Sequence, residues 1–226
     1  MKIFDEILVN AVDNKQRCPE MTLIKVSIDR ENNTITIYND GDGIPVTMHP
    51  EYNTYIPSLI FGQLLSGTNF DDSSKKGIFL EFFLKFSYVV TGGRNGFGAK
   101  LTNIYSTEFR VETVANEKRF VQVFRNNMSE EEKPKVTKAS KSKQFTKITF
   151  KPDLSLFNMT ELDDDMVSVL QRRVYDVAGV TDESVRVYWN NERLNVHDFH
   201  DYVKLFNVWC CYHCYHYKKQ DHTSNY

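Results

Sequence analysis

The sequence has 226 residues, of which 41% are hydrophobic and 26% charged, a length and composition typical of one soluble domain with a substantial core. Its formal net charge of −2 indicates no overall basic field of the kind that nucleic-acid-binding proteins carry. The longest apolar run, within residues 77–90, is interrupted by Glu81 and Lys85 and is too short for a membrane span of about 20 residues. Cys18 is isolated and the other three cysteines crowd the tail, so we expect a reducing compartment without a disulfide framework.

The N-terminal third is predicted to contain a helix, a β-hairpin and a second helix. Apolar residues recur at helical spacing through residues 3–15. Residues 22–29 and 33–40 alternate apolar and polar side chains around the turn "RENN", which predicts two paired strands. A helix is expected over residues 56–65, followed by a long loop over 66–92 that contains "GIFLEFFLKFSYV".

The rest of the chain mixes helices with hairpins. In chain order we expect a helix over 97–106, a hairpin of 108–114 with 119–125, a Lys/Glu/Ser loop over 129–144, a strand over 145–152, a helix over 161–180 and a hairpin over 184–196 with an Asn-Asn turn. Because the strands pair mostly through tight turns, the prediction is an α+β two-layer sandwich, a mixed and largely antiparallel sheet with helices on one face. A doubly wound parallel sheet is disfavoured.

The stretch "VTGGRNGFGAK" (90–100) is rich in glycine and basic residues, which indicates phosphate binding. It is not a P-loop, because Ala99 stands where that motif needs lysine, and Leu101 stands where the dinucleotide fingerprint needs its third glycine. Backbone N–H groups of a glycine loop that enters a helix near Phe97 can still surround phosphates, with Arg94 and Lys100 adding positive charge. A plain helix-capping turn is the alternative.

Two further patterns carry chemistry. Glu6, Asn10 and Asp13 share one polar stripe of the first helix, a pattern that suits a magnesium site and a carboxylate that takes a proton from water. The alternative is a solvated helix face. In "NDGDGIP" (39–45) the glycines allow close approach to a flat ligand, and Asn39 or Asp40 offers an acceptor for an amino group such as that of adenine. The alternative there is a simple turn.

Taken together and in this order, "DEILVNAVDNKQR", "NDGDGIP" and "VTGGRNGFGAKLTNI" closely resemble the ATPase domain of eukaryotic type IIA DNA topoisomerase. That domain belongs to the group that gyrase B, the heat-shock 90 chaperones, MutL and the histidine kinases share. The resemblance covers nearly all of residues 2–206 except about 77–89. It implies a GHKL-type (Bergerat) ATP-binding sandwich with ATP and Mg²⁺ as cofactors.

The resemblance also implies roles for individual residues. Glu6 would be the general base that activates water, and Asn10 would be the magnesium ligand. Asn39 would read adenine above Gly41 and Gly43. The other implied nucleotide contacts are Asp13, Asn14, Thr68, Asn69, Gly93, Arg94, Asn95, Gly96, Phe97, Gly98, Ala99 and Lys100. Gly67 stands where the family usually has serine, which removes one hydroxyl contact.

In this family two ATP molecules clamp two such domains into a homodimer, and hydrolysis resets a gate through which one DNA duplex passes another. The resemblance therefore implies a nuclear protein that acts on DNA and is not bound to membranes. The sequence contains neither the upstream segment that the family exchanges between partners nor the domain whose lysine reaches the γ-phosphate. A non-catalytic ATP-binding fragment, or a chaperone- or MutL-type ATPase, is therefore the alternative.

Two segments, 77–89 and 207–226, depart from this pattern. We expect residues 1–206 to form the ATPase domain and residues 207–226 to be a divergent, unstructured tail. The run at 77–89 is interpreted as a translated intron or gene-model error, in preference to a lid insertion or a membrane or partner anchor. The tail's Cys211, His213, Cys214 and His216 are too crowded for one tetrahedral zinc site. The Lys-rich stretch 133–143 is expected to be a solvated loop, with DNA phosphates as the alternative contact.

Overall fold

A single mixed β-sheet organises the computed structural model, which describes residues 1–63, 98–140 and 143–206. Its strands are β1 (Leu23–Asp29), β2 (Thr34–Asp40), β3 (Ser106–Ala115), β4 (Lys118–Arg125), β5 (Glu130–Glu131), β6 (Lys135–Lys138), β7 (Phe145–Pro152), β8 (Arg186–Trp189) and β9 (Glu192–Arg193). They lie in the order β5-β4-β3-β7-β2-β1-β8-β9, with β6 also paired to β4. Among these described strands β1 and β8 run parallel and the other pairs are antiparallel.

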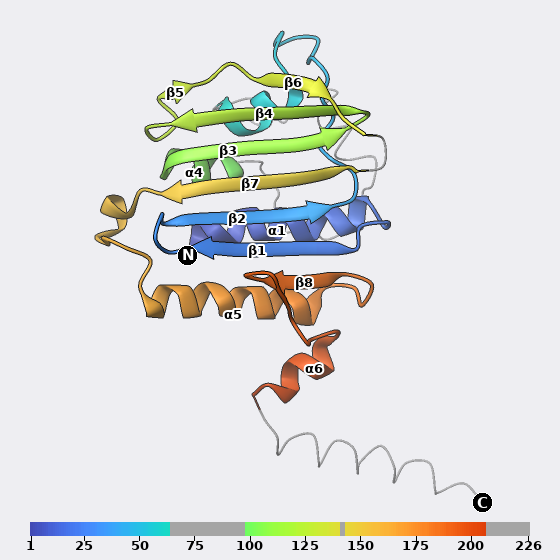
Figure 1. Cartoon of the computed structure of the whole chain (residues 1–226), viewed down its shortest axis with the longest axis vertical. Helices are drawn as coiled ribbons and strands as arrows, with labels where there is room; N and C mark the ends of the chain where they lie inside the picture. The colour runs from blue at the N-terminus through green and yellow to red at the C-terminus, as the bar shows by residue number, and fades with distance from the viewer. Residues whose placement is uncertain (64–97, 141–142, 207–226) are drawn as a thin grey trace, which may run out of the picture.

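Helices cover one face of this sheet, as Figure 1 shows with α1 behind the central strands. The helices are α1 (Lys2–Arg17), α2 (Ile56–Gly62), α4 (Gly98–Ile104), the 3₁₀-helix η1 (Leu154–Phe157), α5 (Asp164–Val180) and α6 (Phe199–Lys204). α4 contacts both α1 and α2, and α5 contacts α1 and β8. The predicted two-layer α+β sandwich with a largely antiparallel sheet is therefore confirmed.

Alternation of buried and less buried residues along the central strands β1 and β2 separates the two faces of the sheet. On β2 the buried residues are Ile35, Ile37 and Asn39, and the intervening side chains are half-buried on the other face. α1 completes the core with its own apolar stripe, which buries Phe4, Ile7, Leu8 and Ala11. Burying such side chains contributes about 1.5–3 kcal/mol each, so this stripe fixes how α1 lies on the sheet.

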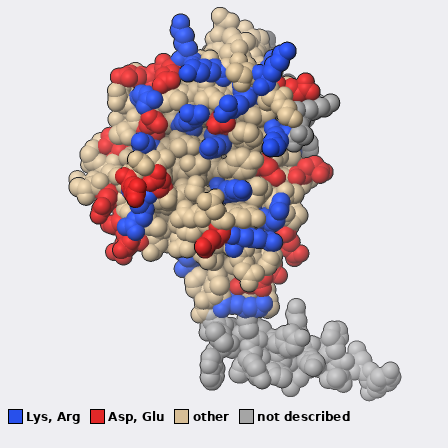
Figure 2. Space-filling view, in the orientation of Figure 1, with Lys and Arg blue, Asp and Glu red and all other residues tan. Residues whose placement is uncertain are grey.

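The face that the helices leave uncovered carries charges of both signs. Figure 2 shows Lys and Arg side chains interspersed with Asp and Glu over this face. Several of them form ion pairs. Arg119 Nη2 on β4 lies 2.7 Å from Glu112 Oε1 on β3, and Arg125 contacts both Glu108 and Glu132. Such pairs satisfy the charges of a solvated sheet face and contribute little stability each.

The structure corrects the sequence prediction in a few places. The loop expected over 129–144 contains β5 and β6, because backbone groups of Lys135–Lys138 pair with the edge of β4 whatever their side chains are. The short helix α6 and the turn η1 were not predicted. The helix expected over 56–65 ends at Gly62, one residue before the described range stops. The expectations for 66–92 and 207–226 lie outside the described residues.

The remaining elements follow their predictions. The Asn-Asn turn joins β8 to β9, with Asn190 and Asn191 at φ 45° and 70°, the left-handed values that a tight hairpin turn requires. None of the helices in the described ranges combines the length and the apolar character that crossing a bilayer requires.

At Gly43 the backbone of β3 leaves no room for a side chain. A Cβ atom there would lie 2.1 Å from the Val114 carbonyl oxygen and 2.8 Å from Thr113 Oγ1. We expect Gly43→Ala to lower the free energy of unfolding by about 1–3 kcal/mol, because β3 must move to admit the methyl group. Chemical denaturation measures it, with Asp42→Ala at the exposed neighbour as the control, expected to stay within about 0.5 kcal/mol. Equal stabilities of the two variants would contradict this close packing.

Candidate active site

Glu6 lies where α1 meets the first residue of α4. Its Oε1 atom is 2.5 Å from Lys2 Nζ, and its side chain is 21% exposed. Its other oxygen, Oε2, lies against the Gly98 backbone, since a Cβ atom on Gly98 would be 1.8 Å from it. The carboxylate therefore occupies the space that any other residue at position 98 would fill, while it remains accessible to water.

α4 is fixed to its neighbours by buried polar side chains. Thr102 Oγ1 donates to the Ile3 carbonyl at 2.9 Å, and Asn103 Nδ2 donates to the Phe61 carbonyl at 2.9 Å. Ala99 and Lys100 are also buried, and burial lowers the pKa of the Lys100 ammonium. The end of the glycine-rich stretch is therefore held rigidly beside α1.

The rest of the predicted stripe on α1 has mixed surroundings. Asn10 is exposed, one turn after Glu6. Asp13 is half-buried. Desolvation lowers the pKa of the neighbouring Arg17, and the charge of Asp13 acts in the opposite direction. Asn14 turns to the sheet instead, where its Nδ2 atom lies 3.5 Å from the Asp40 carbonyl oxygen. Glu6 and Asn10 thus remain the pair with oxygen atoms available to a metal or water.

The structure separates Asn39 from Asp40, which the sequence left as alternatives. Asn39 is 5% exposed and lies on the helix-covered face of β2, where its Nδ2 atom donates to the Asp40 carbonyl at 2.9 Å. The Asp40 carboxylate is already engaged, because it accepts from the backbone N–H groups of Thr22 and Leu23 at 2.9 and 2.7 Å. Asp40 therefore stabilises the start of β1, and Asn39 is the better placed acceptor.

The two glycines after Asn39 have clear roles in the fold itself. Gly41 has a φ of 86°, and its Cα packs against Cys18, Met21 and Asn14. Gly43 approaches β3 closely, and the next residue, Ile44, donates its N–H to Thr113 Oγ1 at 2.8 Å. Both glycines are required by this turn whether or not a ligand contacts it.

Thr113 is a residue of this region that the sequence prediction missed. It is fully buried on β3, and its hydroxyl donates to the Phe145 carbonyl at 3.0 Å while it receives the Ile44 N–H. Phe109 and Val111 alternate towards the core on β3, and this pattern predicts an apolar side chain at position 113. That break in the pattern was the available signal.

The structure describes some of the predicted nucleotide contacts, and the others lie outside the described residues. Gly98, Ala99 and Lys100 lie on α4 beside Glu6, while Asn39, Gly41 and Gly43 lie at the end of β2. The expected contacts Thr68, Asn69, Gly93, Arg94, Asn95, Gly96 and Phe97 lie outside the described residues, as do residues 77–89.

The chain is similar to known proteins over most of its length. It is 50% identical to DNA topoisomerase 2 of Arabidopsis thaliana and 53% identical to that of Candida albicans, in each case over 207 residues, or 91% of the chain. The chain spans only 13% of the length of those two proteins.

Comparison of the fold with solved structures gives the same result as the comparison of sequences. The ATPase region of Saccharomyces cerevisiae topoisomerase II matches 91% of this chain, which covers 51% of that structure, with a TM-score of 0.79 and 49% identity. The ATPase domain of Thermus thermophilus gyrase B shares the fold at a TM-score of 0.60 and 24% identity, over 85% of this chain and 43% of that one. The model of the family described as "Histidine kinase-, DNA gyrase B-, and HSP90-like ATPase" matches residues 1–156. The chain therefore belongs to this ATPase family, and within it the sequence and the fold are similar to the ATPase region of eukaryotic DNA topoisomerase II.

Proposed function

We propose that this chain binds ATP and hydrolyses it as the ATPase domain of a eukaryotic type II DNA topoisomerase. The observation that carries the proposal is the contact between the Glu6 carboxylate and Gly98. These residues belong to two motifs far apart in the sequence, one with a proton acceptor and the other with a glycine-rich phosphate-binding pattern. A base beside a phosphate-binding loop is what hydrolysis of a phosphoanhydride requires.

In the proposed reaction, Glu6 accepts the proton of a water molecule as that water attacks the γ-phosphate. Lys2 pairs with one carboxylate oxygen and Gly98 packs against the other, so the base is positioned before substrate binds. The exposed amide oxygen of Asn10 is the hard ligand that Mg²⁺ prefers, and the ion, when bound, would neutralise charge on the phosphates. Asn39 would accept a hydrogen bond from the adenine amino group, with Gly41, Gly43, Asp13 and Asn14 nearby.

The wider activity is proposed by similarity to longer proteins. Homodimer formation through this domain, action on DNA, a nuclear location and a contribution of residues 94–100 to the ATP lid are all parts of this proposal. The alternative is a fragment that binds ATP without hydrolysing it. The identity of about 50% to eukaryotic DNA topoisomerase 2 favours this family over a chaperone- or MutL-type ATPase.

Replacing the proposed base distinguishes the enzyme from the binding fragment. We expect Glu6→Gln to reduce ATP turnover by about 10²–10⁴-fold and to leave binding of a nonhydrolysable ATP analogue nearly unchanged, because the amide keeps the shape but accepts no proton. Phosphate release measures turnover, and calorimetry measures binding. Glu20→Gln, at an exposed residue after α1, is the control and should turn over normally. Binding without turnover in the unsubstituted chain would instead support the non-catalytic fragment.

Asn39 and Asp40, neighbours on β2, should differ in how their replacement affects the affinity for an ATP analogue. We expect Asn39→Ala to raise the dissociation constant of the ATP analogue by roughly 10-fold, the loss of about one hydrogen bond, and to lower Tm as well, because it removes the buried bond from Nδ2 to the Asp40 carbonyl. Asp40→Asn should lower Tm without changing this affinity, since it removes the negative charge that strengthens both backbone N–H bonds to Oδ1 and replaces Oδ2, which accepts from the Thr22 hydroxyl at 2.9 Å, with an amide nitrogen. Calorimetric titration and thermal unfolding of both variants test this division. A loss of affinity in the Asp40 variant alone would contradict the assignment of adenine recognition to Asn39.

A further inference from the structure

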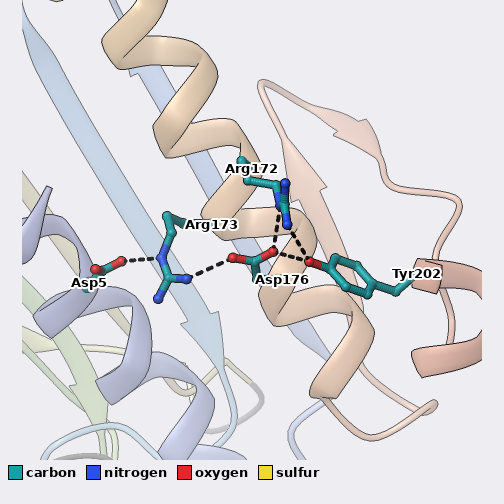
Figure 3. A network of polar contacts seen from close by, with 5 residues as sticks. All are labelled: Asp5, Arg172, Arg173, Asp176 and Tyr202. Atoms are coloured by element: carbon teal, nitrogen blue, oxygen red, sulfur yellow. Dashed lines mark hydrogen bonds and ion pairs between the residues drawn. The ribbon is translucent and has the colours of Figure 1, made fainter. Parts of the chain in front are cut away.

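A chain of polar contacts joins the first turn of α1 to α5 and α6 (Figure 3). Arg173 of α5 donates from Nε to Asp5 Oδ1 at 2.9 Å and from Nη1 to Asp176 Oδ2 at 2.8 Å. Asp176 Oδ1 in turn accepts from Arg172 Nε at 2.9 Å and from the Tyr202 hydroxyl at 2.5 Å. The guanidinium of Arg173 therefore holds two carboxylates from two different helices at fixed positions.

The α1 end of this chain lies beside the proposed base. Asp5 directly precedes Glu6, and its side chain is only 14% exposed, against 39% for Arg173. Their hydrogen bond is the main reason why the pKa of Arg173 is raised. Arg173 compensates the charge of this half-buried carboxylate, which would be costly to leave unpaired.

α1 lacks the usual local restraint at this end. Its N-cap residue, Met1, provides no side-chain hydrogen bond to the free N–H groups of the first turn. Besides the buried Phe4 side chain and the Lys2–Glu6 ion pair at 2.5 Å, two contacts from other helices restrain this turn: the Thr102 hydroxyl donates to the Ile3 carbonyl at 2.9 Å, and Arg173 donates to Asp5. The two contacts come from different helices, α4 and α5, and both act on the turn that leads into Glu6.

We propose that Arg173 is a positioning residue for the ATPase reaction, which it serves by anchoring the first turn of α1 through Asp5. This inference rests on the proposed function of Glu6. Arg173 touches neither nucleotide nor water in this role. It holds the backbone of Asp5 so that the neighbouring Glu6 carboxylate stays against Gly98, within the tight space that this glycine leaves. The planar fork of arginine is essential, because one ammonium cannot reproduce two contacts in fixed directions.

The anchor should affect turnover more than substrate binding. Displacing a catalytic group by about 1 Å can reduce the rate by up to about 100-fold. We expect Arg173→Gln to lower kcat roughly 10- to 100-fold with KM within about twofold, because Asn39 lies on β2 and the proposed contacts on α1, Asn10, Asp13 and Asn14, lie beyond its anchored first turn. Arg173→Lys, which keeps the charge but not the fork, should show an intermediate kcat.

A paired substitution separates positioning from stability. Asp5→Asn with Arg173→Gln removes both charges, so no buried charge is left unpaired, and Tm should return towards the parent value. We expect kcat to stay low in this double variant, because the ionic anchor is still missing. Arg30→Gln is the matched control: it breaks an ion pair of 2.7 Å with Asp164 at the start of α5, and turnover should stay normal.

Hydrogen exchange gives a readout that does not depend on turnover. Amides of residues 2–10 should exchange several-fold faster in Arg173→Gln and in the double variant than in the parent and in Arg30→Gln. Recovery of kcat together with Tm in the double variant, or unchanged exchange of α1 in Arg173→Gln, would overturn the positioning role. An inactive parent chain would contradict the proposed function, and the exchange measurement would still decide whether Arg173 anchors α1.

Discussion

The packing of α1 on the sheet is the interaction on which the rest of this structure depends. One side of the helix buries Phe4, Ile7, Leu8 and Ala11 against the strands, and the opposite side carries Glu6 and Asn10. Because the apolar stripe fixes the rotation of the helix about its axis, it also fixes the direction in which the polar stripe points. α4 then packs on α1 with a glycine as its first residue, and the Glu6 carboxylate fills the space that a side chain there would take.

The residues around the end of β2 have roles in the fold whether or not they also contact a nucleotide. Gly41 and Gly43 are needed by the turn after β2, where one has a positive φ and the other touches the Val114 carbonyl. Asp40 holds the start of β1, and Asn39, one residue earlier, lies on the opposite face of the strand beneath the helices. The site is therefore a continuation of the core packing, with polar residues placed where that packing leaves space.

The secondary structure was largely predictable because alternation and helical periodicity are local properties. The hairpins of β1 with β2, of β3 with β4 and of β8 with β9 all form where alternating segments flank turn residues. The strands β5 and β6 escaped prediction because edge pairing depends on backbone hydrogen bonds and leaves no hydrophobic pattern in so polar a segment. The anchor between Asp5 and Arg173 also left no local signal, since its members lie 168 positions apart.

The sequence by itself determined the family, the α+β class and the residue types that can do the chemistry, because these depend on short motifs and their order. Only the tertiary structure showed that the Asp40 carboxylate is engaged by backbone N–H groups, whereas Asn39 lies on the helix-covered face. It also brought Glu6 into contact with Gly98 and Arg173 into contact with Asp5. These are contacts between segments that are distant along the chain. They arise because the helices share one face of the sheet, and that geometry is set by how the core packs as a whole.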